Sequence, residues 1–121
     1  MNRFAYICVA ASPLFVTSSA SAAYVYDLTG EQFLQMMRHP EPLTTANYMA
    51  REKAYSYLDG VKDATVGVLW CPPKPRKTFE LAYDAAEHIQ TLTPKARQEN
   101  AATILLSFLS EQYPCRKGVR Q

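Results

Sequence analysis

The stretch VLWCPPKPRK, from Val68 to Lys77, decides how the rest of the chain is read. An apolar run ends there at Cys71, and three prolines fall within the next four positions, mixed with three cations. Because a proline pushes the residue before it out of helical dihedrals, a helix that enters this stretch must end in it. The prolines therefore predict a rigid corner, which fixes the direction in which Cys71 points.

The helix that leads into this corner is predicted over 45–70. Its apolar residues recur at spacings of three and four, which is the helical period. Gly60 and Gly67 lie inside it, and each disfavours a helix by about 1 kcal/mol relative to alanine. We expect another helix to approach closely at the side that lacks a Cβ. The predicted buried face consists of Ala54, Tyr57, Leu58, Val61, Ala64, Val68 and Leu69.

Three further helices are predicted from their capping residues. The first covers 29–39, where Thr29 and Gln32 have the spacing of a capping box. The next begins after the corner with Thr78 as its N-cap, and the last begins with Thr93 as N-cap and Pro94 in the first helical position. Because no stretch alternates as a strand does, we predict an all-α, compact four-helix domain. The buried positions expected in these helices are Phe33, Met36, Met37, Phe79, Ala82, Ala86, Ile89, Ala101 or Ala102, Leu105, Phe108, Leu109 and Tyr113.

The first 22 residues are predicted to be a secretory signal peptide and no part of the fold. A cation precedes an apolar run over 4–16, and small residues follow up to Ala22. A membrane anchor is the alternative, but the run is shorter than the roughly 20 apolar residues that a spanning helix needs. We expect cleavage near Ala22 or Ala23, which leaves one helical domain, residues 23–121.

Removing the signal peptide leaves two of the three cysteines, Cys71 and Cys115. Two cysteines in an exported domain predict one disulfide, because the compartment is oxidising. This bond closes a loop of roughly 45 residues, which is worth about 4 kcal/mol in the loop-entropy model. A thiol hydrolase built on a cysteine and His88, or a metal site of both cysteines with His88, are the alternatives. Neither matches the spacing of a known catalytic or zinc pattern.

The remaining sequence carries little that suggests catalysis. It lacks the Gly-rich phosphate loop and the HExxH and GxSxG motifs. Asp59 and Asp63 lie one helical turn apart, but the neighbouring Lys62 favours solvated or capping carboxylates over an acid–base pair. A net charge of +2 does not indicate nucleic-acid binding, which usually shows as a clustered basic face. We predict no enzyme activity, no cofactor and no metal.

The order of several short motifs resembles the Rap/Tai immunity proteins of type VI secretion systems. The motifs, found between Thr29 and Cys115, are Tyr57-Leu58-Asp59-Gly60-Val61 with Asp63, then Cys71-Pro72-Pro73, then Pro114-Cys115. The stretch TGEQFLQMM also looks like the first helix of that family. Many members carry a further cysteine pair, where this chain has Met36 or Met37 and residues 48–50, so a second disulfide is not expected.

The resemblance implies a small exported helical protein, often a dimer, that acts in the periplasm and is not membrane-bound once the signal is cleaved. Its implied partner is a cognate secreted peptidoglycan amidase, which it binds and inhibits so that the producing cell escapes its own toxin. A small periplasmic acid-stress chaperone is the alternative function.

Inhibition is expected to be steric, and a rigid loop suits it because preorganisation lowers the entropy cost of binding. The two candidate loops are the corner at 72–77 and the turn at 90–95. The residues predicted to contact the partner are Lys74, Arg76, Lys77, Gln90, Thr91, Thr93 and Lys95.

Overall fold

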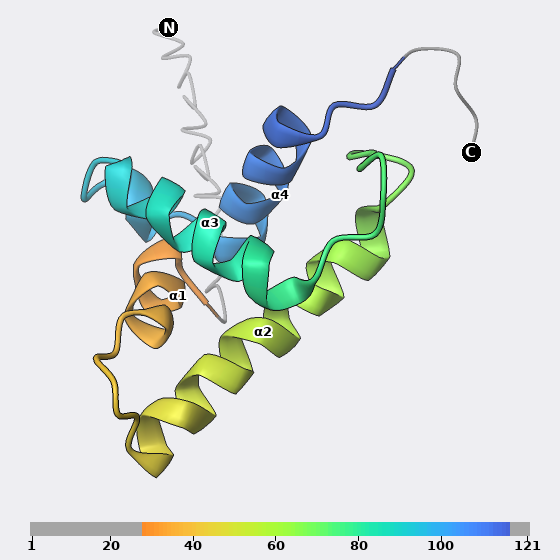
Figure 1. Ribbon diagram of the computed structural model, residues 1–121. Helices are drawn as coiled ribbons and strands as arrows, with labels where there is room; N and C mark the ends of the chain where they lie inside the picture. Colours follow the sequence, from red (N-terminus) through yellow and green to blue (C-terminus); the bar gives the residue numbers. More distant parts are fainter. Residues whose placement is uncertain (1–27, 117–121) are drawn as a thin grey trace, which may run out of the picture.

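Helices make up most of the chain that the computed structural model describes, residues 28–116 (Figure 1). They are α1 (Gly30–Met37), α2 (Thr45–Thr65), α3 (Thr78–Thr91), a short 3₁₀ helix η1 (Ala96–Gln98) and α4 (Ala101–Gln112). The described residues form two isolated β-bridges but no strand, so the predicted all-α class is confirmed. The predicted signal peptide lies outside the described residues. None of the helices within 28–116 is long and apolar enough to cross a membrane.

The capping box predicted at the start of α1 is present. The backbone N–H of Gln32 donates to the Thr29 hydroxyl at 3.2 Å, and the backbone N–H of Thr29 donates to the Gln32 side chain at 2.9 Å. These bonds satisfy two N–H groups that the first turn of a helix leaves without a partner. The helix then buries Phe33, Leu34 and Met37.

The hydrophobic core lies where the four helices meet, and α1 packs against each of the other three. α3 begins beside the middle of α2, where Thr78 donates a hydrogen bond to Asp59, and runs toward α1 (Figure 1). The largest fully buried side chains are Trp70, Phe33, Leu34, Leu58, Leu81, Ile89, Leu105 and Leu109. The predicted core positions of α4 are therefore largely correct, with Tyr113 only partly buried.

The prediction that the second helix continues to Trp70 is wrong, because α2 ends at Thr65. Val66 has extended backbone dihedrals, and Gly67 has a φ of 78°, which favours glycine. The N–H of Gly67 donates to the carbonyl of Trp70 at 2.8 Å, closing a tight turn. The turn buries Trp70, whereas Val68 and Leu69, which were predicted to be core residues, are exposed. Gly67 is therefore needed for a turn and not for helix packing.

The prediction that the last helix begins after Thr93 is also wrong. The Thr93 hydroxyl accepts the N–H of Ala96, the first residue of the short η1, and Lys95 is the N-cap of that helix. The chain then becomes extended and pairs with the segment before α1, since the N–H of Ala101 donates to the carbonyl of Leu28 at 3.0 Å. α4 begins only after this pairing, with Asn100 as its N-cap. A tertiary contact thus interrupts a helix that local signals favour.

Three smaller predictions also need correction. Lys77, and not Thr78, occupies the N-cap position of α3, and Thr78 is the first residue of the helix. Phe79 and Ala64, predicted to be buried, are exposed. No described atom lies within 4 Å of the place where a Cβ on Gly60 would be, so no helix approaches closely there.

Candidate protein-interaction site

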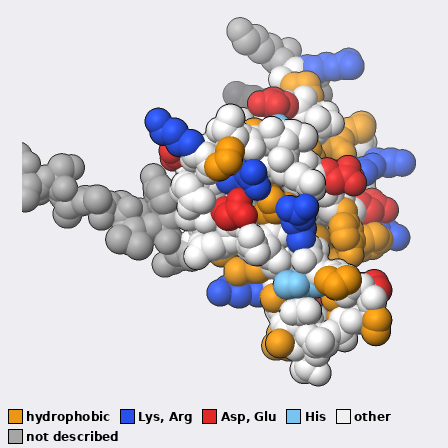
Figure 2. Space-filling view, turned by 90° about the vertical axis from the view of Figure 1, so that its left-hand side faces the viewer, with side chains coloured by type: hydrophobic (Ala, Val, Ile, Leu, Met, Phe, Trp, Pro, Cys, Tyr) orange, Lys and Arg blue, Asp and Glu red, His pale blue; other side chains and the backbone are white. Residues whose placement is uncertain are grey.

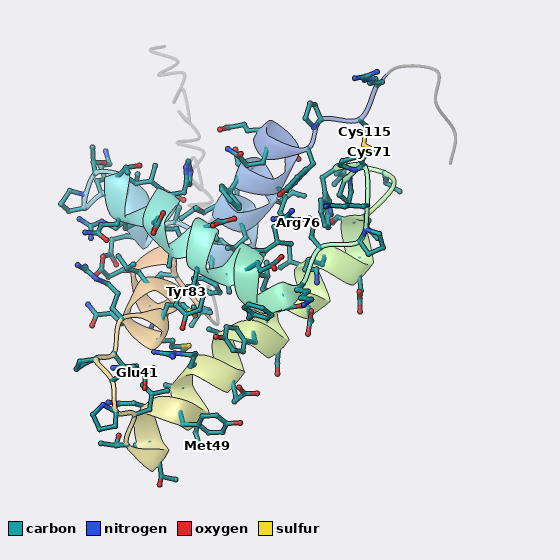
Figure 3. The ribbon with its side chains drawn as sticks, viewed as in Figure 1. Glu41, Met49, Cys71, Arg76, Tyr83 and Cys115 are labelled. Carbon is teal, nitrogen blue, oxygen red and sulfur yellow. A yellow bond between two sulfur atoms is a disulfide. The ribbon has the colours of Figure 1, made fainter. Side chains whose placement is uncertain are left out.

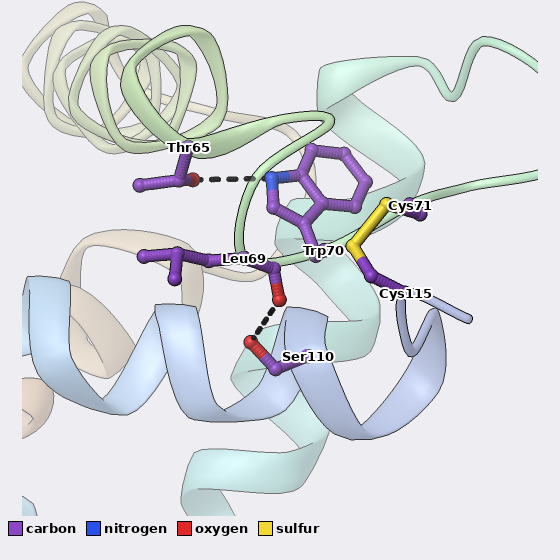
Figure 4. The surroundings of a disulfide bond; sticks show 6 residues. All are labelled: Thr65, Leu69, Trp70, Cys71, Ser110 and Cys115. Atoms are coloured by element: carbon purple, nitrogen blue, oxygen red, sulfur yellow. Dashed lines mark hydrogen bonds between the residues drawn. A yellow bond between two sulfur atoms is a disulfide. The ribbon is translucent and has the colours of Figure 1, made fainter. Parts of the chain in front are cut away.

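The corner after α2 is fixed by a disulfide between Cys71 and Cys115 (Figure 4). The sulfur atoms are 2.08 Å apart and the Cα atoms 4.8 Å apart, as is usual for a disulfide. The N–H of Cys71 also donates to the carbonyl of Tyr113 at 2.8 Å. The predicted disulfide is therefore confirmed. It uses both thiols on which the thiol-hydrolase and metal-site alternatives depended.

Trp70 anchors this corner in the core, a role that the sequence analysis missed. Its side chain is buried, its indole N–H donates to the Thr65 hydroxyl at 3.1 Å, and its ring centre lies 5.9 Å from that of Tyr113. The Ser110 hydroxyl donates to the carbonyl of Leu69 at 2.9 Å (Figure 4). The corner is thus joined to the end of α4 by a covalent bond, hydrogen bonds and packing.

The cations of the corner differ in their accessibility. Lys74 and Lys77 are exposed. Arg76 is partly buried, because its guanidinium lies over the ring of Tyr113 at 5.8 Å and within 3.8 Å of a carboxylate oxygen of Glu80. Arg76 therefore packs within the domain, whereas Lys74 and Lys77 are accessible to a partner.

The second predicted loop lies at the opposite end of α3. Its four predicted contact residues, Gln90, Thr91, Thr93 and Lys95, are all exposed. A helix of 14 residues is about 21 Å long, so the structure does not bring this turn and the 72–77 corner together. On the face that carries α1 and the end of α3, positive and negative side chains are mixed and not gathered by sign (Figure 2).

A third surface, which the sequence analysis missed, lies between α2 and α3. We call it the aromatic face, and it consists of Tyr48, Arg51, Tyr55, Phe79 and Tyr83. The three outer rings are 43–52% exposed, although they are large and partly apolar. The spacings i, i+3 and i+7 on α2, and i and i+4 on α3, place these side chains on one side of each helix. Figure 3 shows Tyr83 far from the disulfide, on the half of the molecule that carries Glu41.

Arg51 is the buried centre of the aromatic face. Its guanidinium donates to a carboxylate oxygen of Glu41 at 3.0 Å and to the carbonyl of His39 at 3.2 Å, and it lies 5.7 Å from the ring centre of Tyr83. Burial by itself lowers the pKa of Arg51, but the hydrogen bond to Glu41 and the charges of nearby groups outweigh it, so the pKa is raised. The residue is therefore a fixed cation that holds the α1–α2 connection and Tyr83 in place.

Tyr55 adds a partly buried phenol to this face. Burial, followed by a hydrogen bond with Tyr83, raises the pKa of Tyr55 to about 12. The phenol therefore stays neutral at physiological pH. The face combines neutral aromatic side chains with one guanidinium that is already held by the protein.

The residues that sequence reasoning examined for catalysis have structural contacts. Asp59 accepts hydrogen bonds from Thr78 and from Lys62, whose ammonium lies 3.2 Å away. The ring of His88 lies 5.3 Å from that of Phe108. Within residues 28–116 no group of three or more histidine, cysteine or acidic side chains is placed to hold a metal ion.

The described residues form a small all-α domain in which a disulfide joins the corner after α2 to the segment after α4. The family model of the Rap1a immunity proteins matches residues 29–115, which is most of the chain. The chain therefore belongs to the Rap1a immunity protein family. No curated protein matches the chain.

Proposed function

We propose that this protein is a periplasmic immunity protein, which binds a cognate peptidoglycan amidase secreted by a type VI system and blocks its active site. We propose that inhibition is steric: the rigid domain covers the amidase active site and excludes the substrate, and no side chain of this protein needs to act as a catalyst. The family match supports the immunity role. The amidase target, the type VI system, the export signal and the periplasmic location are parts of the proposal.

The aromatic face is the observation that supports a protein partner most directly. Tyrosine, phenylalanine and arginine are enriched in the cores of protein interfaces, and exposed apolar groups of this kind usually mark a binding site. Because Arg51 is held by Glu41 and the His39 carbonyl, little side-chain entropy is lost when a partner covers the face. We therefore place the main contact with the amidase on this face.

The two predicted loops border α3 at its two ends and are proposed as the rim of the contact. Lys77 connects the corner to the face, because its ammonium lies 5.7 Å from the ring centre of Phe79. Gln90 lies eleven positions after Phe79 on α3, which is about three helical turns and hence nearly the same side. Rim charges such as Lys74 and Lys95 affect the association rate more than the affinity.

The proposal is tested by co-producing the exported protein with the secreted amidase encoded beside its gene. Cells are expected to survive with the wild-type protein, and the amidase is expected to co-purify with it. Tyr83→Ala is expected to weaken binding by at least about 10-fold, as truncation of a central aromatic residue does. Val68→Ser, at a still more exposed apolar position on the far corner, serves as the control and is expected to change little.

Two outcomes separate the parts of the proposal. If the wild-type protein neither binds the amidase nor protects the cells, the amidase is not the target. If it protects and Tyr83→Ala protects equally well, while Lys74→Glu or Lys95→Glu abolishes binding, the contact lies on the loops. Light scattering of the purified protein tests the dimer that the family resemblance implies.

A further inference from the structure

An open apolar groove of about 540 Å³ lies between α2 and α4, away from the aromatic face. None of the described residues that line it is charged. Its walls are Tyr57, Gly60, Val61 and Ala64 from α2 and Ala102 and Leu106 from α4. An uncharged hollow of this kind between two helices is suited to an apolar occupant.

Gly60, on the α2 wall of the groove, has no structural reason among the described residues to be a glycine. It lies within a 21-residue helix, where glycine is unfavourable. Gly30 has a neighbouring side chain against its backbone, and Gly67 has a positive φ, but Gly60 shows neither feature. A Cβ at Gly60 would point into space that no described atom occupies within 4 Å. The absent side chain leaves room for something outside residues 28–116.

The chain enters the described structure at one end of this groove. Leu28 and Gly30 pair in antiparallel fashion with Ala101 and Glu99, at 3.0 Å for each hydrogen bond. If the same antiparallel direction continued, residues placed before Leu28 would lie beside Ala102 and Thr103, which line the groove.

The sequence before Leu28 has the right chemistry and reach. It reads Ala23-Tyr24-Val25-Tyr26-Asp27, so three large, mostly apolar side chains precede one carboxylate at the point of entry. Five extended residues span about 17 Å. The α2 wall from Ser56 to Thr65 is about 14 Å long at the helical rise. We propose that Tyr24, Val25 and Tyr26 of the same chain occupy the groove between α2 and α4.

This intramolecular docking has a consequence for how the mature protein is made. If the signal peptide is cleaved near Ala22 or Ala23, the residues that fill the groove become the new N-terminus of the chain. The groove is then closed to a second copy or to another protein. The inference does not depend on the amidase being the target.

The proposal is tested by making one substitution, Gly60→Leu, in two versions of the mature chain that begins at Ala23, each with its disulfide formed. Gly60→Leu is expected to lower the Tm by several degrees, because the new side chain competes with the docked segment. The same substitution in a chain that also carries Tyr24→Ser, Val25→Ser and Tyr26→Ser is expected to raise the Tm, because the groove is then open. An equal shift in both backgrounds would overturn the proposal.

A photo-crosslinking benzoyl-phenylalanine at Leu106 identifies the occupant directly. The expected product is an internal crosslink to the peptide that contains Tyr24–Tyr26, mapped by mass spectrometry. The same group at Glu87, on the exposed side of α3, is the control and is expected to give no such product. A crosslink from Leu106 to a second copy or to another protein, or no crosslink to residues 23–27, would contradict the docking.

Discussion

The two ends of α4 are held to the rest of the domain in different ways. The carboxyl end is joined to the corner by the Cys71–Cys115 disulfide, with Trp70 packed beside it. The amino end has no covalent tie among the described residues, and depends on the pairing of Thr29 with Asn100 and on the close approach of Gly30. The comparison shows two ways of holding one helix. At its carboxyl end a covalent bond constrains the unfolded chain, and at its amino end close packing stabilises the folded chain.

The largest effect is expected from breaking the covalent end. The Cys71→Ser and Cys115→Ser double variant should lose about 4 kcal/mol of unfolding free energy, because the unfolded chain regains the entropy of an open loop. This value is calculated from the sequence separation of 44 residues between the two cysteines, which sets the length of the closed loop. Urea unfolding monitored by circular dichroism gives the loss. A midpoint that does not change would show that the bond stabilises nothing.

The next effect is expected from Gly30→Ala at the other end. The added Cβ would lie 2.5 Å from Cδ1 of Ile104 and 3.1 Å from the carbonyl oxygen of Arg97, so one of them must move. Such overpacking costs about 1–3 kcal/mol. Thermal unfolding measures it.

A second substitution checks the cause of that loss. Ile104→Val removes the Cδ1 atom that the new Cβ would meet. In the wild-type background this change should cost about 1 kcal/mol, as a buried isoleucine-to-valine change usually does. In the Gly30→Ala background it should cost less or even stabilise. Equal costs in the two backgrounds would place the strain elsewhere.

The smallest effect is expected from an ion pair at each end. Arg97 and Glu31, which connect η1 to α1, are 3.1 Å apart and partly buried, whereas Arg76 and Glu80 at the corner are 3.8 Å apart and more exposed. Double-mutant cycles with glutamine should give a coupling of about 1 kcal/mol for the first pair and less for the second. A larger coupling at the corner would reverse the comparison.

The difference between the ends also explains what the sequence could predict. Cysteines and prolines are visible without any structure, so the disulfide, the corner and the helical class were correctly inferred. Gly30, Arg97 and Glu31 meet only in three dimensions, and no local pattern shows that the chain at 99–101 pairs with the segment before α1. The last helix was therefore predicted to begin too early, from the capping signal of Thr93 and Pro94.

The aromatic face was missed for a related reason. Apolar periodicity tells which side of a helix is apolar, but not whether a neighbour covers it. Phe79 was assigned to the core by its spacing from Ala82 and Ala86, whereas the structure leaves it exposed beside Tyr83. Arg51 on α2 pairs with Glu41, which lies in the proline-containing connection before that helix. Helical spacing does not predict this contact, because the connection is not helical.

The disulfide also has a topological consequence, because it makes a ring of the chain from Cys71 to Cys115. Exposed turns such as 90–95 are where proteases usually cut. One such cut inside the ring leaves two fragments that are still linked, with α3 on one and α4 on the other. The protein can therefore be nicked once in this region and remain a single covalent molecule.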